Sequence, residues 1–460
     1  MSGALSVRRF ARRCGDKTAR YGLLVGALAL TAFFTSIDSA WATEPDRPAL
    51  RPSVGGDSPP AALPVASSIR IVRFGETTRI AFDVTSHLDV RAFVMAEPDR
   101  VIVDVPETIF AVDSEAGQRA SPVRGKKPAS GDAAPSGLIG SYRFGKLGAG
   151  RSRVVIDLDR PARILKAETE VSEEGRLRLL VDLVPTDRAT FTAAATEAAR
   201  ANAAPSTMGV AIANPSATSK PVVVIDPGHG GIDVGAVAKG RAPEKEIVFE
   251  FARALEAVLV QTGRYEVVMT RTEDVFVPLG QRVQIARAAN AQLLLSIHAD
   301  TLSEGGVSGA TVYTVSDKAS DAHAARLAEK ENFADKIAGA DGVEEGGGVS
   351  DILFDLARRE TRAYSHVFAR TLVSVWKDAA RLNKNPIRSA GFTVLKAPDV
   401  PSALLELGYL SSEKDSALLS DPQWRAKTAK AVAVSIDRFF AMRSPGNTAE
   451  DNAGVASITP

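Results

Sequence analysis

The second half of the chain alternates short apolar runs with longer segments of helical periodicity. The apolar runs at 222–225, 293–297 and 403–407 have the length and composition of strands that are buried on both faces. Segments 244–261 and 279–290 repeat apolar residues at the three- and four-residue spacing of amphipathic helices. This alternation predicts a three-layer α/β domain with a mostly parallel or mixed sheet and flanking helices. Further strands are expected at 265–270, 309–315 and 392–395, and further helices at 364–380 and 422–442.

The first half has a different texture, in which single apolar and polar residues alternate between clusters of turn residues. This period of two is typical of strands with one buried face, so residues 68–185 are expected to form a small all-β sandwich. His87, the only histidine of this region, is expected to be a solvated turn residue. Residues 186–220 are rich in Ala, Thr, Ser and Pro and predict a partly helical linker. The alternating runs are 69–74, 78–84, 100–105, 153–158 and 176–183.

The N-terminus carries the pattern of an export signal. Basic residues precede an apolar core at 22–34, and Ala40 and Ala42 supply the small residues of a cleavage site, with the cut expected after Ala42. The apolar core is short for a membrane span, which needs about 20 residues. We therefore expect a signal peptide over 1–42 and a periplasmic mature protein that is not an integral membrane protein. Two Arg-Arg pairs suit twin-arginine export as well as a plain basic region.

Composition narrows the chemistry that the chain can carry. Its 460 residues allow two or three domains, and the net charge of +1 gives no sign of a nucleic-acid partner. The only cysteine, Cys14, lies in the expected signal peptide, so a metal in the mature chain must use histidine and carboxylate ligands. We expect a flexible segment at 43–67, a catalytic domain at 221–442 and a disordered tail at 443–460.

Three apolar strands of the second half each deliver a chemically active side chain at or near their carboxyl end. His229 follows the first strand in a Pro-Gly turn, His298 follows the second and Glu406 ends the third. Open α/β sheets bind their ligands beyond the carboxyl ends of the strands. These three side chains are therefore expected to meet in one site.

Two imidazoles, those of His229 and His298, need only one carboxylate to complete the three-ligand set of a catalytic zinc ion. Glu244, Glu246 and Glu250 all lie near the start of the first helix. Helical spacing places Glu244 on the apolar face and the other two on the outer face. A carboxylate on an apolar face needs a partner that offsets its desolvation, and a metal ion would be one. An acid near a helix start also complements the helix dipole, so this second interpretation stands beside ligation.

Glu406 suits a different role. It ends an almost unbroken apolar strand, where an unpaired carboxylate is costly. A zinc hydrolase needs a general base that takes a proton from the attacking water, and Glu406 is the candidate. The alternative is a structural carboxylate paired with an arginine such as Arg282.

Four motifs of the second half, taken together and in order, are typical of one enzyme family. They lie at 226–231, 244–245, 296–300 and 406–411, and residues 221–441 resemble the zinc-dependent N-acetylmuramoyl-L-alanine amidases. The resemblance implies a hydrolase that cleaves the amide between the lactyl group of N-acetylmuramic acid and the L-alanine of the peptidoglycan stem peptide. Such an enzyme acts in cell-wall turnover and daughter-cell separation.

The same resemblance implies a role for each candidate residue. One zinc ion per catalytic domain would be held by His229, Glu244 and His298, and Glu406 would be catalytic. Val234 departs from the family pattern, since proline is usual at this position. The β-rich segment in front resembles the AMIN domain, which implies peptidoglycan as the partner and a septal location.

The segment at 317–362 is long for a connection and contains a helical pattern at 321–338. Glu331 falls on the weakly apolar face of this pattern, where its carboxylate could take the open zinc position. Division amidases carry an inserted autoinhibitory helix that LytM-type activator proteins relieve, so the resemblance implies such a partner. Glycines between 339 and 348 would give the segment mobility. The alternative is an ordinary surface glutamate.

Two other functions fit parts of the pattern. A non-catalytic peptidoglycan-binding division scaffold would bind through the β-sandwich and carry an inactive second domain. The presence of all three ligands and Glu406 argues against it, because an inactive copy has no chemical need of them. A zinc carboxypeptidase acting on stem peptides would use the same ligand set, and the family motifs supply most of the argument against it.

Overall fold

The computed structural model describes residues 62–112, 138–148, 150–202, 220–238, 240–301, 307–339 and 352–443. Several sequence predictions lie outside these residues: the signal peptide, most of the flexible segment that follows it, the second half of the linker, the tail from residue 444 and the glycines at 342–348. Within the described ranges, no helix combines the length and the apolar composition that a membrane span requires.

The N-terminal part consists of two largely antiparallel sheets. Their strand orders are β5-β1-β2-β9-β8 and β3-β4-β7-β6. Every second residue of β2 is buried, as expected for a strand with one face in a core. The strands are β1 Val65–Phe74, β2 Thr77–Val84, β3 Arg91–Met95, β4 Arg100–Pro106, β5 Ile109–Phe110, β6 Ile139–Gly148, β7 Arg151–Leu158, β8 Ala162–Val171 and β9 Leu177–Pro185.

The inner faces of the two sheets share one hydrophobic core. Ile80 and Phe82 of β2 are fully buried in it together with Val101 and Val103 of β4. Helix α1 (Arg188–Asn202) follows the last strand and buries Phe191 in the same core. The prediction of a small all-β sandwich is confirmed, and α1 occupies the first half of the predicted linker.

A six-stranded mixed sheet forms the centre of the C-terminal part, in the order β11-β10-β12-β15-β13-β14. The first four strands are mutually parallel, whereas β13 runs antiparallel to β15 and parallel to β14. The carboxyl ends of β10, β12 and β15 therefore lie side by side at one end of the strands, the carboxyl edge of the sheet. The strands are β10 Val222–Pro227, β11 Glu266–Met269, β12 Leu293–His298, β13 Ala310–Val315, β14 Leu382–Ala390 and β15 Ser402–Glu406.

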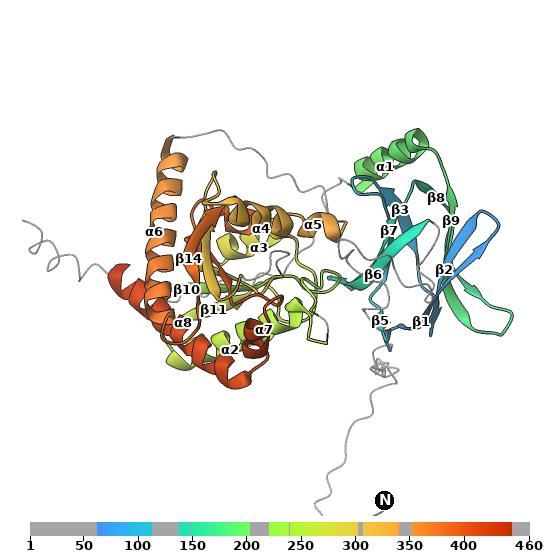
Figure 1. Ribbon diagram of the computed structural model, residues 1–460. Helices are drawn as coiled ribbons and strands as arrows, with labels where there is room; N and C mark the ends of the chain where they lie inside the picture. The colour runs from blue at the N-terminus through green and yellow to red at the C-terminus, as the bar shows by residue number, and fades with distance from the viewer. Residues whose placement is uncertain are drawn as a thin grey trace, which may run out of the picture. The chain divides into compact units, whose positions relative to one another are not determined.

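Helices cover both faces of this sheet (Figure 1). Helices α2, α6 and α8 pack against one face, and α3 and α4 pack against the other. The predicted three-layer α/β architecture is thus confirmed. The helices are α2 Glu244–Thr262, α3 Leu279–Ala288, α4 Ala322–Asn332, α5 Ala334–Ile337, α6 Ile352–Trp376, the 3-10 turn η2 Thr393–Leu395, α7 Glu413–Leu419 and α8 Pro422–Arg443.

One predicted strand is wrong. The apolar run at 392–395 forms η2 instead of a strand, and its side chains pack into the core beside α4. The strand of this region is β14, whose sequence is mostly polar because it lies at the edge of the sheet. An apolar run predicts burial, and burial alone does not distinguish a strand from a tight turn.

Candidate active site

His229 lies in the tight turn that follows β10, and its backbone is left-handed, with φ at 58°. Its Nδ1 atom hydrogen-bonds to Asp233 Oδ2 at 2.8 Å, which directs Nε2 into the site. Gly235 packs against this ring: a Cβ atom there would lie 2.7 Å from His229 Cδ2 and 2.8 Å from Glu244 Oε2. The position therefore requires glycine, both for this close approach and for its own φ of 68°.

Two buried arginines hold the backbone of this turn. Arg282 donates hydrogen bonds to the carbonyl oxygens of Pro227 at 2.9 Å and His229 at 2.8 Å. Arg271 donates to the carbonyl oxygens of Pro227 and Gly228, both at 3.0 Å. All three carbonyl groups of the turn thus bind a guanidinium, which stabilises a backbone conformation that is unfavourable for histidine.

The carboxylate of Asp226 is the anionic partner of Arg282. It is fully buried and accepts hydrogen bonds from Arg282 Nη1 at 2.7 Å and from the hydroxyls of Thr270 and Ser296, both at 2.6 Å. Burial opposes ionisation of Asp226, but the charge of Arg282 and these hydrogen bonds hold its pKa below the usual value. Because Arg282 pairs with Asp226, the alternative that it partners Glu406 is wrong.

Glu244 is the first residue of α2, and its side chain is fully buried. Its two carboxylate oxygens accept hydrogen bonds from the backbone N–H groups of Ala236 and Ala299, each at 2.8 Å. The oxygen Oε1 also lies 3.1 Å from His229 Nε2 and 3.4 Å from His298 Nδ1. The carboxylate that helical phase selected thus lies close to both imidazoles.

His298 and Glu406 are neighbours at the carboxyl ends of the parallel strands β12 and β15, where they occupy paired positions. The imidazole of His298 lies so close to Gly228 that a Cβ atom there would stand 2.4 Å from His298 Cε1. Glu406 is fully buried, and its Oε2 accepts a hydrogen bond from the backbone N–H of Asp300 at 3.1 Å. Its other oxygen, Oε1, has no hydrogen-bond partner among the described residues.

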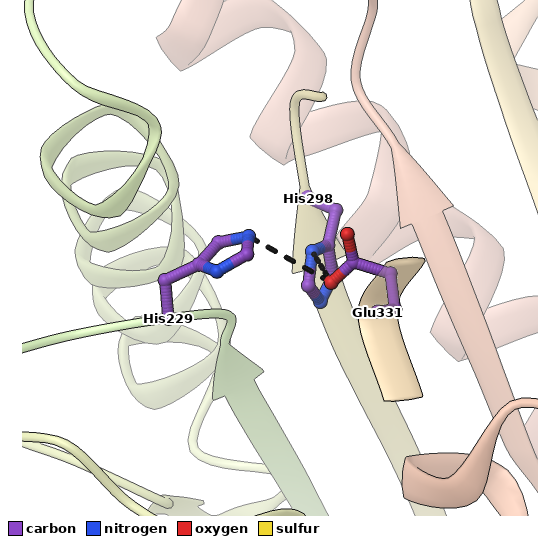
Figure 2. A group of neighbouring side chains, drawn as sticks. All are labelled: His229, His298 and Glu331. Carbon is purple, nitrogen blue, oxygen red and sulfur yellow. Dashed lines mark ion pairs between the residues drawn. The ribbon is translucent and has the colours of Figure 1, made fainter. Parts of the chain in front are cut away.

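Glu331 reaches the same site from helix α4 and is 5% exposed. Figure 2 shows its carboxylate pointing at the two imidazoles. Its Oε2 lies 3.2 Å from His298 Nδ1 and 3.7 Å from His229 Nε2. Glu331 is therefore part of the site and is not an ordinary surface glutamate.

Helix α4 has a capped N-terminus and packs through its apolar face. Asp321 caps its N-terminus by accepting a hydrogen bond from the backbone N–H of Ala324 at 2.9 Å. Leu327 is buried among residues of β13, β15 and η2. The helix ends at Asn332, and α5 begins two residues later, so the predicted single helix at 321–338 consists of two helices.

Four side-chain atoms lie close enough together to share one metal ion. Two imidazole nitrogens face two carboxylate oxygens at 3.1–3.7 Å, and neither nitrogen has a hydrogen-bond partner within the described part of the chain. Ligand atoms bound to zinc at about 2.0–2.2 Å in tetrahedral geometry lie about 3.3–3.6 Å from one another. A zinc ion would satisfy both orphaned nitrogens, so this chain's residues fit that group. The four atoms are His229 Nε2, His298 Nδ1, Glu244 Oε1 and Glu331 Oε2.

Burial and neighbouring charges give these groups different proton affinities. Burial alone lowers the pKa of His229, but the carboxylates of Asp233, Glu244 and Glu331 outweigh it and hold that pKa well above its usual value. Burial raises the pKa of Glu244, but the two imidazoles outweigh it and hold that pKa well below the usual value. For Glu406, burial and the carboxylate of Glu244 act together and raise the pKa. The site thus contains one carboxyl group with low proton affinity, Glu244, and one with high proton affinity, Glu406.

Two contributors to the site were missed in the sequence. Asp233 orients His229, and a carboxylate four residues after a ligating histidine could have indicated this, because such histidines usually donate their second N–H to an acceptor. The ammonium group of Lys330 pairs with the buried carboxylate of Asp300. No local pattern indicated this pair, because the two residues meet only when α4 docks.

The chain matches known proteins along most of its length. Residues 223–438 match the N-acetylmuramoyl-L-alanine amidase family, and residues 68–183 match the AMIN domain. The N-acetylmuramoyl-L-alanine amidase AmiC of Escherichia coli is 30% identical over 392 residues, which are 83% of this chain and 91% of that protein. AmiC of Neisseria meningitidis is 29% identical over 401 residues, which are 83% of this chain and 93% of that protein. AmiA of Escherichia coli K12 is 36% identical over 222 residues, which are 48% of this chain and 76% of that protein.

The chain belongs to the N-acetylmuramoyl-L-alanine amidase family.

This amidase family membership confirms the resemblance that the sequence motifs indicated. The protein is a cell-wall hydrolase of C–N amide bonds, with an AMIN domain in front of its catalytic domain. All five residues that the sequence selected, from His229 to Glu406, fall within the region that matches the amidases. The cluster at the carboxyl edge of the sheet is therefore the candidate active site of a cell-wall amidase.

Proposed function

We propose that this protein hydrolyses the amide between the lactyl group of N-acetylmuramic acid and the L-alanine of the stem peptide, and that one zinc ion serves the reaction. The observation that carries the proposal is the set of two imidazole nitrogens and two carboxylate oxygens at 3.1–3.7 Å. Zinc, when bound, supplies a Lewis acid that polarises a carbonyl group and makes water more acidic.

His229, Glu244 and His298 are the proposed permanent ligands. Their orientation is supported by groups outside the ligand set, because Asp233 fixes His229 and two backbone N–H groups fix Glu244. Two imidazoles and one carboxylate leave one zinc position for the reaction, which is the arrangement of catalytic zinc sites.

Glu406 is the proposed general base. Its Oε2 is anchored on the backbone N–H of Asp300, which leaves Oε1 to accept a proton from the attacking water. Glu406 occupies the strand position paired with His298, one of the proposed ligands. The same carboxyl group can then pass the proton to the nitrogen of the departing amine.

The resting enzyme is proposed to be autoinhibited by Glu331, whose carboxylate lies 3.2 Å and 3.7 Å from the two imidazole nitrogens and would take the fourth zinc position. Substrate and Glu331 would compete for that position. Activation then requires α4 to leave the site, and a LytM-type activator protein is the proposed partner that moves it. The cost of removing α4 includes exposure of Leu327 and of the other apolar residues on its buried face.

The cellular setting follows from the proposed domain boundaries. A signal peptide over 1–42 would deliver the enzyme to the periplasm, an AMIN domain over 68–185 would direct it to septal peptidoglycan, and a catalytic domain over 221–442 would cleave there. Daughter-cell separation is the proposed role.

Mass spectrometry of digested sacculi tests the bond that is cleaved. A full-length Glu331→Ala variant loaded with zinc is expected to release intact stem peptides with free L-alanine amino termini. A Glu406→Gln variant should keep its zinc and lose activity by roughly 10²- to 10⁴-fold, the usual contribution of a general base. Shortened stem peptides would identify a carboxypeptidase instead, and binding to sacculi without any product would identify a scaffold.

A further inference from the structure

Lys330 and Glu331 present an ammonium and a carboxylate to the active site from adjacent positions of α4. Glu331 faces the two imidazoles, and the ammonium of Lys330 pairs with Asp300. The carboxylate of Glu406, the proposed base, accepts a hydrogen bond from the backbone N–H of Asp300. Two adjacent charged side chains of α4 thus contact groups of the proposed active site, Glu331 at the imidazoles and Lys330 at Asp300.

Asp300 is an unusual partner for a surface lysine. Its side chain is fully buried, whereas the side chain of Lys330 is 45% exposed. The oxygen Oδ1 accepts from Lys330 and from the backbone N–H of Thr301, while Oδ2 has no hydrogen-bond partner among the described residues. Lys330 is the only cationic side chain that pairs with Asp300 among the described residues, so Asp300 loses its counter-charge if α4 leaves. A buried carboxylate without a partner is costly, so an incoming cation would be favoured there.

The proposed reaction generates a cation at this place. Water adds its oxygen to the lactyl carbonyl carbon, the C–N bond breaks, and both protons of the water end on the amide nitrogen. The products are a carboxylate on N-acetylmuramic acid and an ammonium on L-alanine, so one neutral amide and one water become one anion and one cation. Lys330 and Glu331 carry the same two charged groups.

We propose that the Asp300 carboxylate is the binding group for the amine of L-alanine as it leaves, and that Lys330 and Glu331 occupy the two product positions in the resting enzyme. This inference rests on the proposed amidase function. Asp300 then favours the C–N bond cleavage that Glu406 assists, because the departing nitrogen becomes positively charged beside it. The helix would then inhibit the enzyme in the way that bound products do. The carboxylate of Glu331 fills the position of the product carboxylate, and the ammonium of Lys330 fills that of the product amine.

The test measures binding of a peptide product to the full chain with zinc bound, in a Lys330→Met, Glu331→Ala parent that lacks both charged groups of α4. The probe is the tripeptide L-alanyl-γ-D-glutamyl-diaminopimelate. Its matched partner carries a propionyl group in place of L-alanyl, which removes only the amine. Calorimetry should show the free amine bound roughly 10- to 100-fold more tightly, the value of a hydrogen bond between charged groups.

Adding Asp300→Asn to this parent should abolish the difference between the two peptides while zinc content stays unchanged. The matched control is Asp399→Asn, which removes an exposed carboxylate that pairs with Arg287 and should leave the difference intact. In sacculus digestion, Asp300→Asn should lower kcat more than it changes KM, and inhibition by the free-amine tripeptide should disappear.

Equal affinity for the two peptides in the parent would overturn the proposal, even if the Asp300→Asn protein does not fold. An unchanged preference in a folded Asp300→Asn protein would overturn it as well. Failure of the amidase function itself is seen separately, because the parent would then release no peptides with free L-alanine termini from sacculi.

Discussion

At the scale of single residues, the proposed zinc ligands depend on a neighbour that has no side chain. Gly235 touches both His229 and Glu244, and a Cβ atom there would overlap the two ligands. We expect Gly235→Ala to displace them and to weaken zinc binding on the order of 10- to 100-fold, as disturbance of the groups around a zinc site does. Competition with a chelator of known affinity measures the zinc Kd.

Gly240 supplies a matched control for this change. Its φ of 70° is close to that of Gly235, but a Cβ atom there would meet nothing within 4 Å. Gly240→Ala carries the same backbone penalty of about 1–2 kcal/mol and should leave the zinc Kd unchanged. Equal zinc affinity in both variants would show that the ligands tolerate a methyl group at 235.

Asp226 is expected to contribute to stability instead of chemistry. Asp226→Asn leaves the buried Arg282 without its counter-charge and should lower the free energy of unfolding by about 3 kcal/mol at pH 7. The folded state lowers the pKa of Asp226, so its contribution is complete above the unfolded-state pKa, near 3.9, and is lost as the pH falls through the folded-state value. Urea unfolding of both proteins measures the difference, which should shrink below about pH 4.

The exposed pair of Arg287 and Asp399 gives the comparison for this experiment. Both side chains are about half exposed, so Asp399→Asn should change the free energy of unfolding by less than about 1 kcal/mol at any pH. The free energy of unfolding could instead differ by the same amount between Asp226→Asn and the natural chain at pH 7 and below pH 4. That result would argue against an ionised Asp226 as the source of the stability.

Single residues were predictable where a periodic pattern fixed their direction. Glu244 could be distinguished from Glu246 and Glu250 because it shares a helical face with buried apolar residues, and the structure leaves the other two exposed. The roles of Arg271 and Arg282 could not be predicted in this way. They bind backbone carbonyl groups of a turn about 40 to 60 residues away, and no local pattern records such a contact.

At the scale of elements, α4 is the proposed inhibitory part of the enzyme, because it carries Glu331. Glu331→Ala removes the carboxylate from the proposed fourth zinc position, so basal hydrolysis of purified sacculi should rise at least several-fold without an activator. Release of soluble peptidoglycan fragments measures it. Glu329→Ala is the control, since Glu329 lies on the same helix but is exposed. Unchanged basal activity in the Glu331 variant would remove this residue from the inhibitory mechanism.

Elements were predictable when their periodicity matched their surroundings. Strands β10, β12 and β15 are buried on both faces and are almost unbroken apolar runs, which made their carboxyl ends recognisable. Edge strand β14 carries little apolar signal, and the apolar turn η2 imitates a strand. The break between α4 and α5 was not indicated either, because the residues on both sides continue one apolar stripe.

At the scale of the whole molecule, the two domain types have separate hydrophobic cores. Residues of the β-sandwich core lie between 66 and 195, and those of the main catalytic core lie between 223 and 439. We expect a chain without residues 68–185 to keep zinc binding and product specificity, but to lose its septal position in dividing cells. Fluorescence microscopy of tagged full-length and shortened chains compares the two. Septal enrichment of the shortened chain would assign localisation to another part of the protein.

The division into two domain types was predictable because each core imposes its own period on the sequence. A period of two marks the sandwich, as in β2, and a helical period alternating with apolar runs marks the catalytic domain. The pairing of Lys330 with Asp300 lies beyond such patterns, because it joins an inserted helix to a strand end that only the complete fold brings together.

Anomalous diffraction at the zinc absorption edge, from crystals of the natural chain, tests the proposed zinc centre most directly. We predict one strong peak in the catalytic domain at about 2.0–2.2 Å from four ligand atoms. They belong to His229, Glu244, His298 and Glu331. No peak at the carboxyl edge of the sheet, or a peak bound by other residues, would contradict both the zinc assignment and the proposed resting state.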